Sequence, residues 1–86
     1  MHTKITNLKN DGNHWSWMVE ECNQHEETTT TEYATDKNGG GIWTYNPHKK
    51  EWVQIAGFCD FSLAGYSLSG ARKKLRRKFD PLYDYK

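Results

Sequence analysis

Cys22 and His25 stand three positions apart in the stretch CNQH, and a thiolate with an imidazole at such a short separation can bind zinc. His48 and Cys59 could complete a set of four ligands. These two stand eleven residues apart, whereas a structural zinc site normally has a second close pair. The sequence therefore predicts no metal site, with Cys22, His25, His48 and Cys59 as weak candidates.

Four glutamates near a turn could be paired as a general acid and a general base: Glu20, Glu21, Glu26 and Glu27. Catalytic carboxylates are usually tuned by burial, and charged turns are usually solvated. No nucleophile, base and pocket converge anywhere in the sequence. We therefore expect a protein that is not an enzyme and has no cofactor.

The segment ARKKLRRKF, residues 71–79, carries six cations in nine positions, although the net charge of the chain is only +1. Residues 1–66 hold five Lys or Arg against nine acids, whereas residues 67–86 hold seven against two. Such a cationic segment can neutralise phosphates and release their counterions, which gives salt-sensitive binding of RNA or DNA. The six cations are Arg72, Lys73, Lys74, Arg76, Arg77 and Lys78.

Three aromatic residues strengthen the nucleic-acid hypothesis, because Trp43, Tyr45 and Trp52 could stack unpaired bases while Lys49 and Lys50 hold the backbone. The sequence thus predicts binding of single-stranded RNA or DNA through a basic C-terminal helix and aromatics on a sheet. A purely structural interpretation stays open. Arg and Lys are good helix formers, and a small core needs large side chains.

A second functional hypothesis uses the acidic part of the chain. The glutamates named above, together with Glu32 and Asp36, could engage a basic surface of a host protein. Small chains of this kind include adaptors and inhibitors, some of them phage-encoded, that cover a partner's surface. Exposed Trp, Tyr and Arg would serve such an interface equally well. Composition alone does not separate a nucleic-acid partner from a protein partner.

The elements that must position these residues fit one domain over residues 1–86, because a chain of this length permits one small core. No run of 18 apolar residues and no signal-peptide pattern is present, so we expect a soluble cytoplasmic protein that does not bind membranes. Residues 1–12 either pair as a first strand or fray, since Ile5 and Leu8 would lie on opposite faces of a strand. Residues 80–86 form a tail.

In the middle of the chain, side chains of one kind recur at every second position, which predicts strands. Residues 14–20 place Trp15, Trp17 and Val19 on one face, after a turn at 10–13 that contains Asp-Gly. Residues 28–35 are rich in threonine, which predicts an exposed or edge strand. A glycine loop at 36–41 precedes a hairpin of 42–45 and 51–56, in which Tyr45 faces Trp52.

A helix is expected from Ser67 or Ser69 to Phe79 or Asp80, since serine caps helices and Pro81 disfavours a helical residue before it. Its apolar stripe comprises Leu68, Ala71, Leu75 and Phe79, which Leu82 could extend. We expect this stripe to pack on the hairpin face that carries Ile42, Val53 and Ile55. The predicted fold is α+β, a four- to five-stranded antiparallel β-meander with one C-terminal α-helix packed on the sheet.

Overall fold

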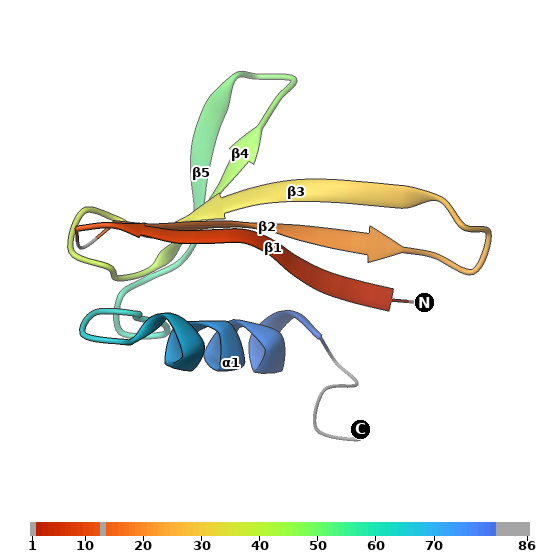
Figure 1. The fold of residues 1–86 in the computed structure, drawn as a ribbon. Coiled ribbons are helices and arrows are strands. Elements are labelled where there is room, and N and C mark those ends of the chain that lie inside the picture. Colours follow the sequence, from red (N-terminus) through yellow and green to blue (C-terminus); the bar gives the residue numbers. More distant parts are fainter. Residues whose placement is uncertain (1, 13, 81–86) are drawn as a thin grey trace.

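The computed structural model describes residues 2–12 and 14–80, and it confirms the predicted α+β fold. Five antiparallel strands lie in the sheet in the order of the chain, and a C-terminal helix packs on one face of that sheet (Figure 1). The elements are β1 (His2–Asp11), β2 (His14–Cys22), β3 (Thr28–Ala34), β4 (Ile42–Asn46), β5 (Glu51–Ala56) and α1 (Leu68–Phe79).

The core lies between α1 and the face of the sheet formed by β1, β2 and the end of β3. The alternation predicted for β2 is confirmed, because Trp15, Trp17 and Val19 are all buried. From the helix side, Ala71 and Leu75 are fully buried against them. Burial of large aromatic side chains therefore supplies much of the apolar area of this small core.

A β-bulge explains why the first strand looked ambiguous in the sequence. The pairing of β1 with β2 shifts between Thr6 and Lys9, where β1 has one residue more than its partner strand. Asn7 has a φ of 53°, in the left-handed region that asparagine tolerates better than most residues. The extra residue resets the alternation, so both Ile5 and Leu8 pack on the core.

The hairpin of β4 and β5 has the predicted register, with Tyr45 opposite Trp52. It leaves the main sheet early, because β3 pairs with β4 only through Tyr33 and Ala34. Figure 1 shows the hairpin rising on the side of the sheet opposite to α1. The threonine-rich part of β3 consequently lies exposed, as its composition predicted.

The position predicted for the helix on the hairpin is wrong. Ile42 is buried, but Val53 and Ile55 are 42% and 53% exposed, because the hairpin points away from α1. The helix packs instead on β1 and on the tryptophan face of β2. Leu68 was also placed wrongly in the stripe, since it lies exposed in the first turn of α1. Leu82 and the rest of the tail after Asp80 lie outside the described residues.

The helix boundaries follow the predicted capping residues. Ser67 is the N-cap, and its Oγ accepts a 3.2 Å hydrogen bond from the Gly70 amide. Before the helix, the connection at 57–67 buries Phe61 and Leu63 in the core. None of the helical structure in residues 2–12 and 14–80 has the length and apolar character that crossing a bilayer requires.

Candidate nucleic-acid interface

The outward side of α1 is basic from Arg72 to Lys78. Ala71 and Leu75 point into the core, Lys74 and Arg76 are half-buried, and the other basic positions face solvent. The segment from Leu68 to Phe79 contains no acidic residue, and its last turn contains Arg76, Arg77 and Lys78, where the helix dipole favours cations. The exposed cations are Arg72, Lys73, Arg77 and Lys78.

Not all six cations are equally available to a ligand. Lys74 is half-buried, and its Nζ donates a 2.8 Å hydrogen bond to the carbonyl oxygen of Ser62. The same Nζ lies 4.9 Å from the ring centroid of Phe61 and 4.8 Å from that of Tyr66. Arg76 and Arg77 each interact with other groups of the chain. Lys78 Nζ lies farther from the Phe61 ring centroid, at 6.0 Å, and its side chain is exposed. Arg72, Lys73 and Lys78 therefore form the part of the helix surface with the clearest access to a phosphate.

The aromatic residues of the hairpin lie together on one of its faces. The rings of Tyr45 and Trp52 are 5.3 Å apart and inclined by 59°, and Trp52 is 46% exposed. Trp43 and Tyr45 are half-buried. Lys49 and Lys50 are exposed in the turn that joins β4 to β5, so cations flank this aromatic face at the tip of the hairpin.

The structure divides the predicted site residues into two surfaces. The six cations lie on α1, beneath the sheet in Figure 1, whereas the aromatics and the turn lysines lie on the hairpin that rises above it. The sheet separates the two surfaces. A single strand of nucleic acid must pass around an edge of the molecule to reach both.

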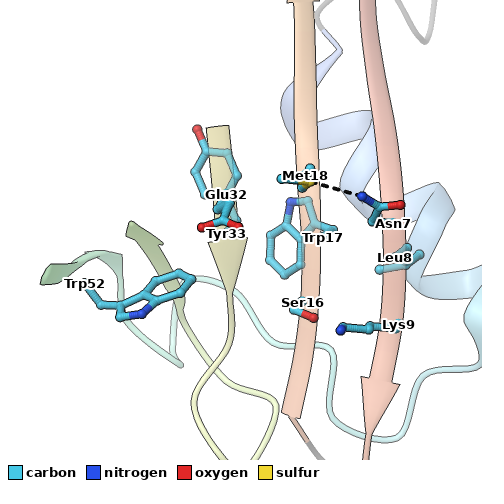
Figure 2. A pocket seen from close by; sticks show the side chains of 9 residues that line it. All are labelled: Asn7, Leu8, Lys9, Ser16, Trp17, Met18, Glu32, Tyr33 and Trp52. Carbon is cyan, nitrogen blue, oxygen red and sulfur yellow. Dashed lines mark hydrogen bonds between the residues drawn. The ribbon is translucent and has the colours of Figure 1, made fainter. Parts of the chain in front are cut away.

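A concave surface absent from the sequence-based prediction lies where the hairpin meets the outer face of the sheet. We call it the corner cleft. Figure 2 shows Trp52 reaching from the hairpin toward side chains of β1, β2 and β3. The cleft has a volume of about 520 Å³, which is in the range of small-molecule sites. Its lining includes Asn7, Lys9, Ser16, Met18, Glu32 and Trp52.

The polar groups of the corner cleft offer both donors and acceptors. The Asn7 amide donates to Met18 Sδ at 3.1 Å. Lys9 adds a cation, and Glu32 adds a carboxylate that could accept from an exocyclic amino group of a base. Strand alternation places Ser16, Met18 and Glu32 on the outer face, opposite to the buried tryptophans, and the bulge in β1 turns Asn7 and Lys9 to the same face. Only the direction of the hairpin, which no residue pattern indicates, makes them a cleft.

Trp52 also lines a second hollow on the same side of the sheet, which we call the side cleft. This hollow has a volume of about 310 Å³ and includes His14, Asp36 and Trp43 in its lining. Because Trp52 stands between the two clefts, planar groups can approach its indole ring from more than one direction. Flat aromatic rings stack on exposed tryptophan without a requirement for sequence.

An aromatic cluster packs on the inner side of the sheet, below the corner cleft. Tyr33 stacks on Trp17 at 5.9 Å and lies 4.8 Å from the ring of Phe79. Burial raises the pKa of Tyr33 above its usual 10.0, and the negative charge of Glu21 raises the pKa further. Trp17 Nε1 is buried without a hydrogen-bond partner among the described groups.

The weak metal candidates lie on separate elements: Cys22 ends β2, His25 lies in the following turn, His48 lies at the hairpin tip, and Cys59 lies in an exposed loop. Both cysteines are free thiols. Within residues 2–12 and 14–80, no three His, Cys, Asp or Glu side chains lie close enough together to hold a metal ion.

No protein-family model, no curated protein and no solved structure matches this chain.

Proposed function

We propose that this protein binds single-stranded RNA or DNA without catalysing a reaction, and that α1 provides the contact with phosphate. The observation that carries the proposal is that every charged residue of the helix is a cation. The helix presents cations on its outward side and contains no acid between Leu68 and Phe79. Cations presented in this way attract a polyanion and release its counterions.

The bases of the strand are proposed to stack on Trp52. Its indole ring is exposed and borders both clefts, and Lys9 lies in the lining of the corner cleft. Stacking of bases on aromatic side chains is tolerant of sequence. Because α1 and the hairpin that carries Trp52 lie on opposite sides of the sheet, we expect short oligonucleotides to reach one surface and longer ones to gain affinity by reaching both.

The experiment that tests the phosphate contact is a titration of a labelled single-stranded oligonucleotide at several salt concentrations. The variant carries Arg72→Gln, Lys73→Gln and Lys78→Gln, which leaves the internally bonded Lys74 in place. We expect the plot of log affinity against log salt concentration to become less steep. The magnitude of its slope should decrease by about 0.7 for each phosphate that is no longer neutralised, or by about 2 in total.

A matched control removes one charge outside α1 and outside the hairpin, with Lys37→Gln, and is compared with the single helix change Arg72→Gln. Both residues are exposed, so neither variant should disturb the core. A larger decrease in affinity for the helix variant supports the proposal. Equal decreases would mean that net charge, and not α1, determines the affinity, and would reject the helix as the contact surface.

A protein partner is the second candidate, and the observation that favours it is the exposure of apolar side chains on β5. Val53 and Ile55 are 42% and 53% exposed, whereas soluble proteins rarely leave contiguous apolar patches uncovered. If this strand contacts a protein, Val53→Lys should reduce recovery of a stoichiometric partner from a nuclease-treated lysate and leave oligonucleotide affinity unchanged. A decrease in oligonucleotide affinity on that change would instead extend the base contact proposed at Trp52 along β5.

A further inference from the structure

The outer edge of the sheet at β5 is the most exposed apolar part of the described chain. Every residue from Glu51 to Ile55 is exposed. Trp52 is 46% exposed, Val53 42%, Ile55 53%, and Phe58, just beyond the strand, 71%. Large apolar side chains on both faces of an edge strand normally mark a surface that a partner covers.

The opposite edge of the same sheet is protected in ways that β5 is not. At β1 the bulge at Asn7 interrupts the ladder, Lys4 and Lys9 add charge, and α1 packs against the strand. Bulges, lysines and covering elements are the usual means of preventing edge-to-edge pairing. The segment Glu51–Ala56 has no lysine, no proline and a single charge at its first residue. The sheet is therefore protected against pairing at one edge and open to pairing at the other.

We propose that β5 pairs in antiparallel fashion with β5 of a second copy of the chain, forming a two-fold symmetric dimer with one continuous sheet. A closed two-fold dimer buries both free edges at once and leaves no further edge for growth. This inference concerns the hairpin alone and does not depend on any property of α1.

The sequence of β5 is complementary to itself in one register. A two-fold axis through the sheet keeps each side chain on its own face, so residues opposite each other must differ by an even number of positions. With the axis at Gln54, Val53 faces Ile55 of the second copy, and Trp52 faces the small Ala56 of the second copy. Aliphatic side chains then meet on one face, and a large ring meets a small side chain on the other.

The charges at the two ends of the hairpin favour the same antiparallel arrangement. Lys49 and Lys50 are exposed at its tip, beside Glu51, and Asp60 is exposed just beyond its base. Antiparallel pairing brings the tip of one copy near the base of the other. The lysines of each copy then approach Asp60 of the other, and the symmetry repeats this match at both ends. This charge match favours a second copy of the chain over an unrelated strand.

The first test measures the mass of the full chain by sedimentation over a range of protein concentrations in the absence of nucleic acid. We expect a monomer–dimer equilibrium, which Val53→Lys abolishes because it places a charge opposite the apolar Ile55 of the second copy. Thr30→Lys is the matched control, since Thr30 is an exposed residue of β3. At each protein concentration, this variant should have the same apparent mass in solution as the unchanged chain. Circular dichroism of both variants excludes loss of the fold as the cause.

The second test fixes the register by disulfide formation. In a chain with Cys22→Ser and Cys59→Ser, Gln54→Cys places two thiols opposite each other at the axis, near the separation that a disulfide needs. Gln54→Cys should crosslink at least tenfold faster than Thr30→Cys. A monomer at every concentration, with equal crosslinking of the two variants, would overturn the proposal. Protection of β5 amides from hydrogen exchange only after another protein or an oligonucleotide is added would also overturn it, in favour of that partner.

Discussion

The Nζ atom of Lys74 donates a 2.8 Å hydrogen bond to the carbonyl oxygen of Ser62, which ties the middle of α1 to the connection before it. The rings of Phe61 and Tyr66 lie within 5 Å of the same ammonium group, so cation–π attraction adds to the hydrogen bond. One of the six helix cations thus stabilises the fold. Fewer than six cations are therefore available to a ligand.

Lys74→Met should therefore reduce stability more than affinity. Removal of a hydrogen bond to a charged group and of two ring interactions predicts a decrease of about 2 kcal/mol in the free energy of unfolding. Arg72→Gln should have the reverse pattern, with unchanged stability and weaker binding. Urea denaturation and oligonucleotide titration of both variants measure the two effects. Equal stability of the two variants would contradict an internal role for Lys74.

Trp52→Ala should weaken binding only when the ligand has bases. Stacking on an aromatic side chain contributes about 1–3 kcal/mol per base, so we expect roughly tenfold weaker binding of a single-stranded oligonucleotide. An abasic oligonucleotide keeps the phosphates and should bind both proteins equally. The unfolding midpoint should not change greatly, because Trp52 is nearly half exposed. A similar decrease with the abasic ligand would show that Trp52 does not stack a base.

The sequence was sufficient to predict elements whose signals are local. Tyr45 and Trp52 were placed opposite each other from strand alternation and the intervening turn with Pro47, and the structure has that register. The start of α1 was predicted from the capping serines, and Ser67 is the N-cap. Such signals depend on residues close together in the chain, so one sequence contains enough information to read them.

The features that were missed depend on tertiary structure. The sequence around Asn7 has no pattern that indicates a bulge, yet the bulge decides that both Ile5 and Leu8 face the core. Likewise, only the short pairing of β3 with β4 turns the hairpin away from α1. The position of the helix and the existence of the corner cleft both follow from that turn, which explains why Val53 was wrongly expected beneath the helix.

The bulge itself makes a prediction about Asn7, whose φ of 53° lies in the left-handed region. Asn7→Gly should leave stability nearly unchanged, because glycine adopts positive φ freely. Asn7→Val should reduce the free energy of unfolding by about 1–2 kcal/mol, since a β-branched residue is strained there. Thermal unfolding of the two variants distinguishes them. Similar midpoints for both would mean that the backbone at this position does not require positive φ.

The raised pKa of Tyr33 predicts a loss of stability at alkaline pH. In the unfolded chain the phenol ionises near its usual pKa of 10.0, and in the folded protein it ionises at higher pH because of burial and the charge of Glu21. The unfolded state therefore releases this proton first, so stability falls as the pH rises from 10.0 toward the folded pKa. Tyr33→Phe should flatten this part of the stability curve. In addition, Glu21→Gln should lower the pKa of Tyr33, as followed by phenolate absorbance.

Gly40 is required by close packing against the loop after β5. Its backbone does not need positive φ, but a Cβ atom there would lie 2.7 Å from Cβ and 3.5 Å from Cα of Phe58. Because both atoms are fixed to the backbone of Phe58, rotation of the exposed ring cannot relieve the clash. Gly40→Ala should therefore reduce the free energy of unfolding by about 1–3 kcal/mol. Gly12→Ala provides a comparison, since its φ of 78° brings strain but no atom lies within 4 Å of the added Cβ.

A double-mutant cycle shows whether the contact with Phe58 is the cause. Phe58 is 71% exposed, so Phe58→Gly should have a modest effect of its own while removing the Cβ atom that Gly40→Ala meets. The two changes together should then be less destabilising than the sum of the separate effects, with a coupling of about 1 kcal/mol. Additive effects would locate the strain elsewhere in the glycine loop. Coupling of the expected sign would show that the approach of this loop to residue 58 requires glycine at position 40.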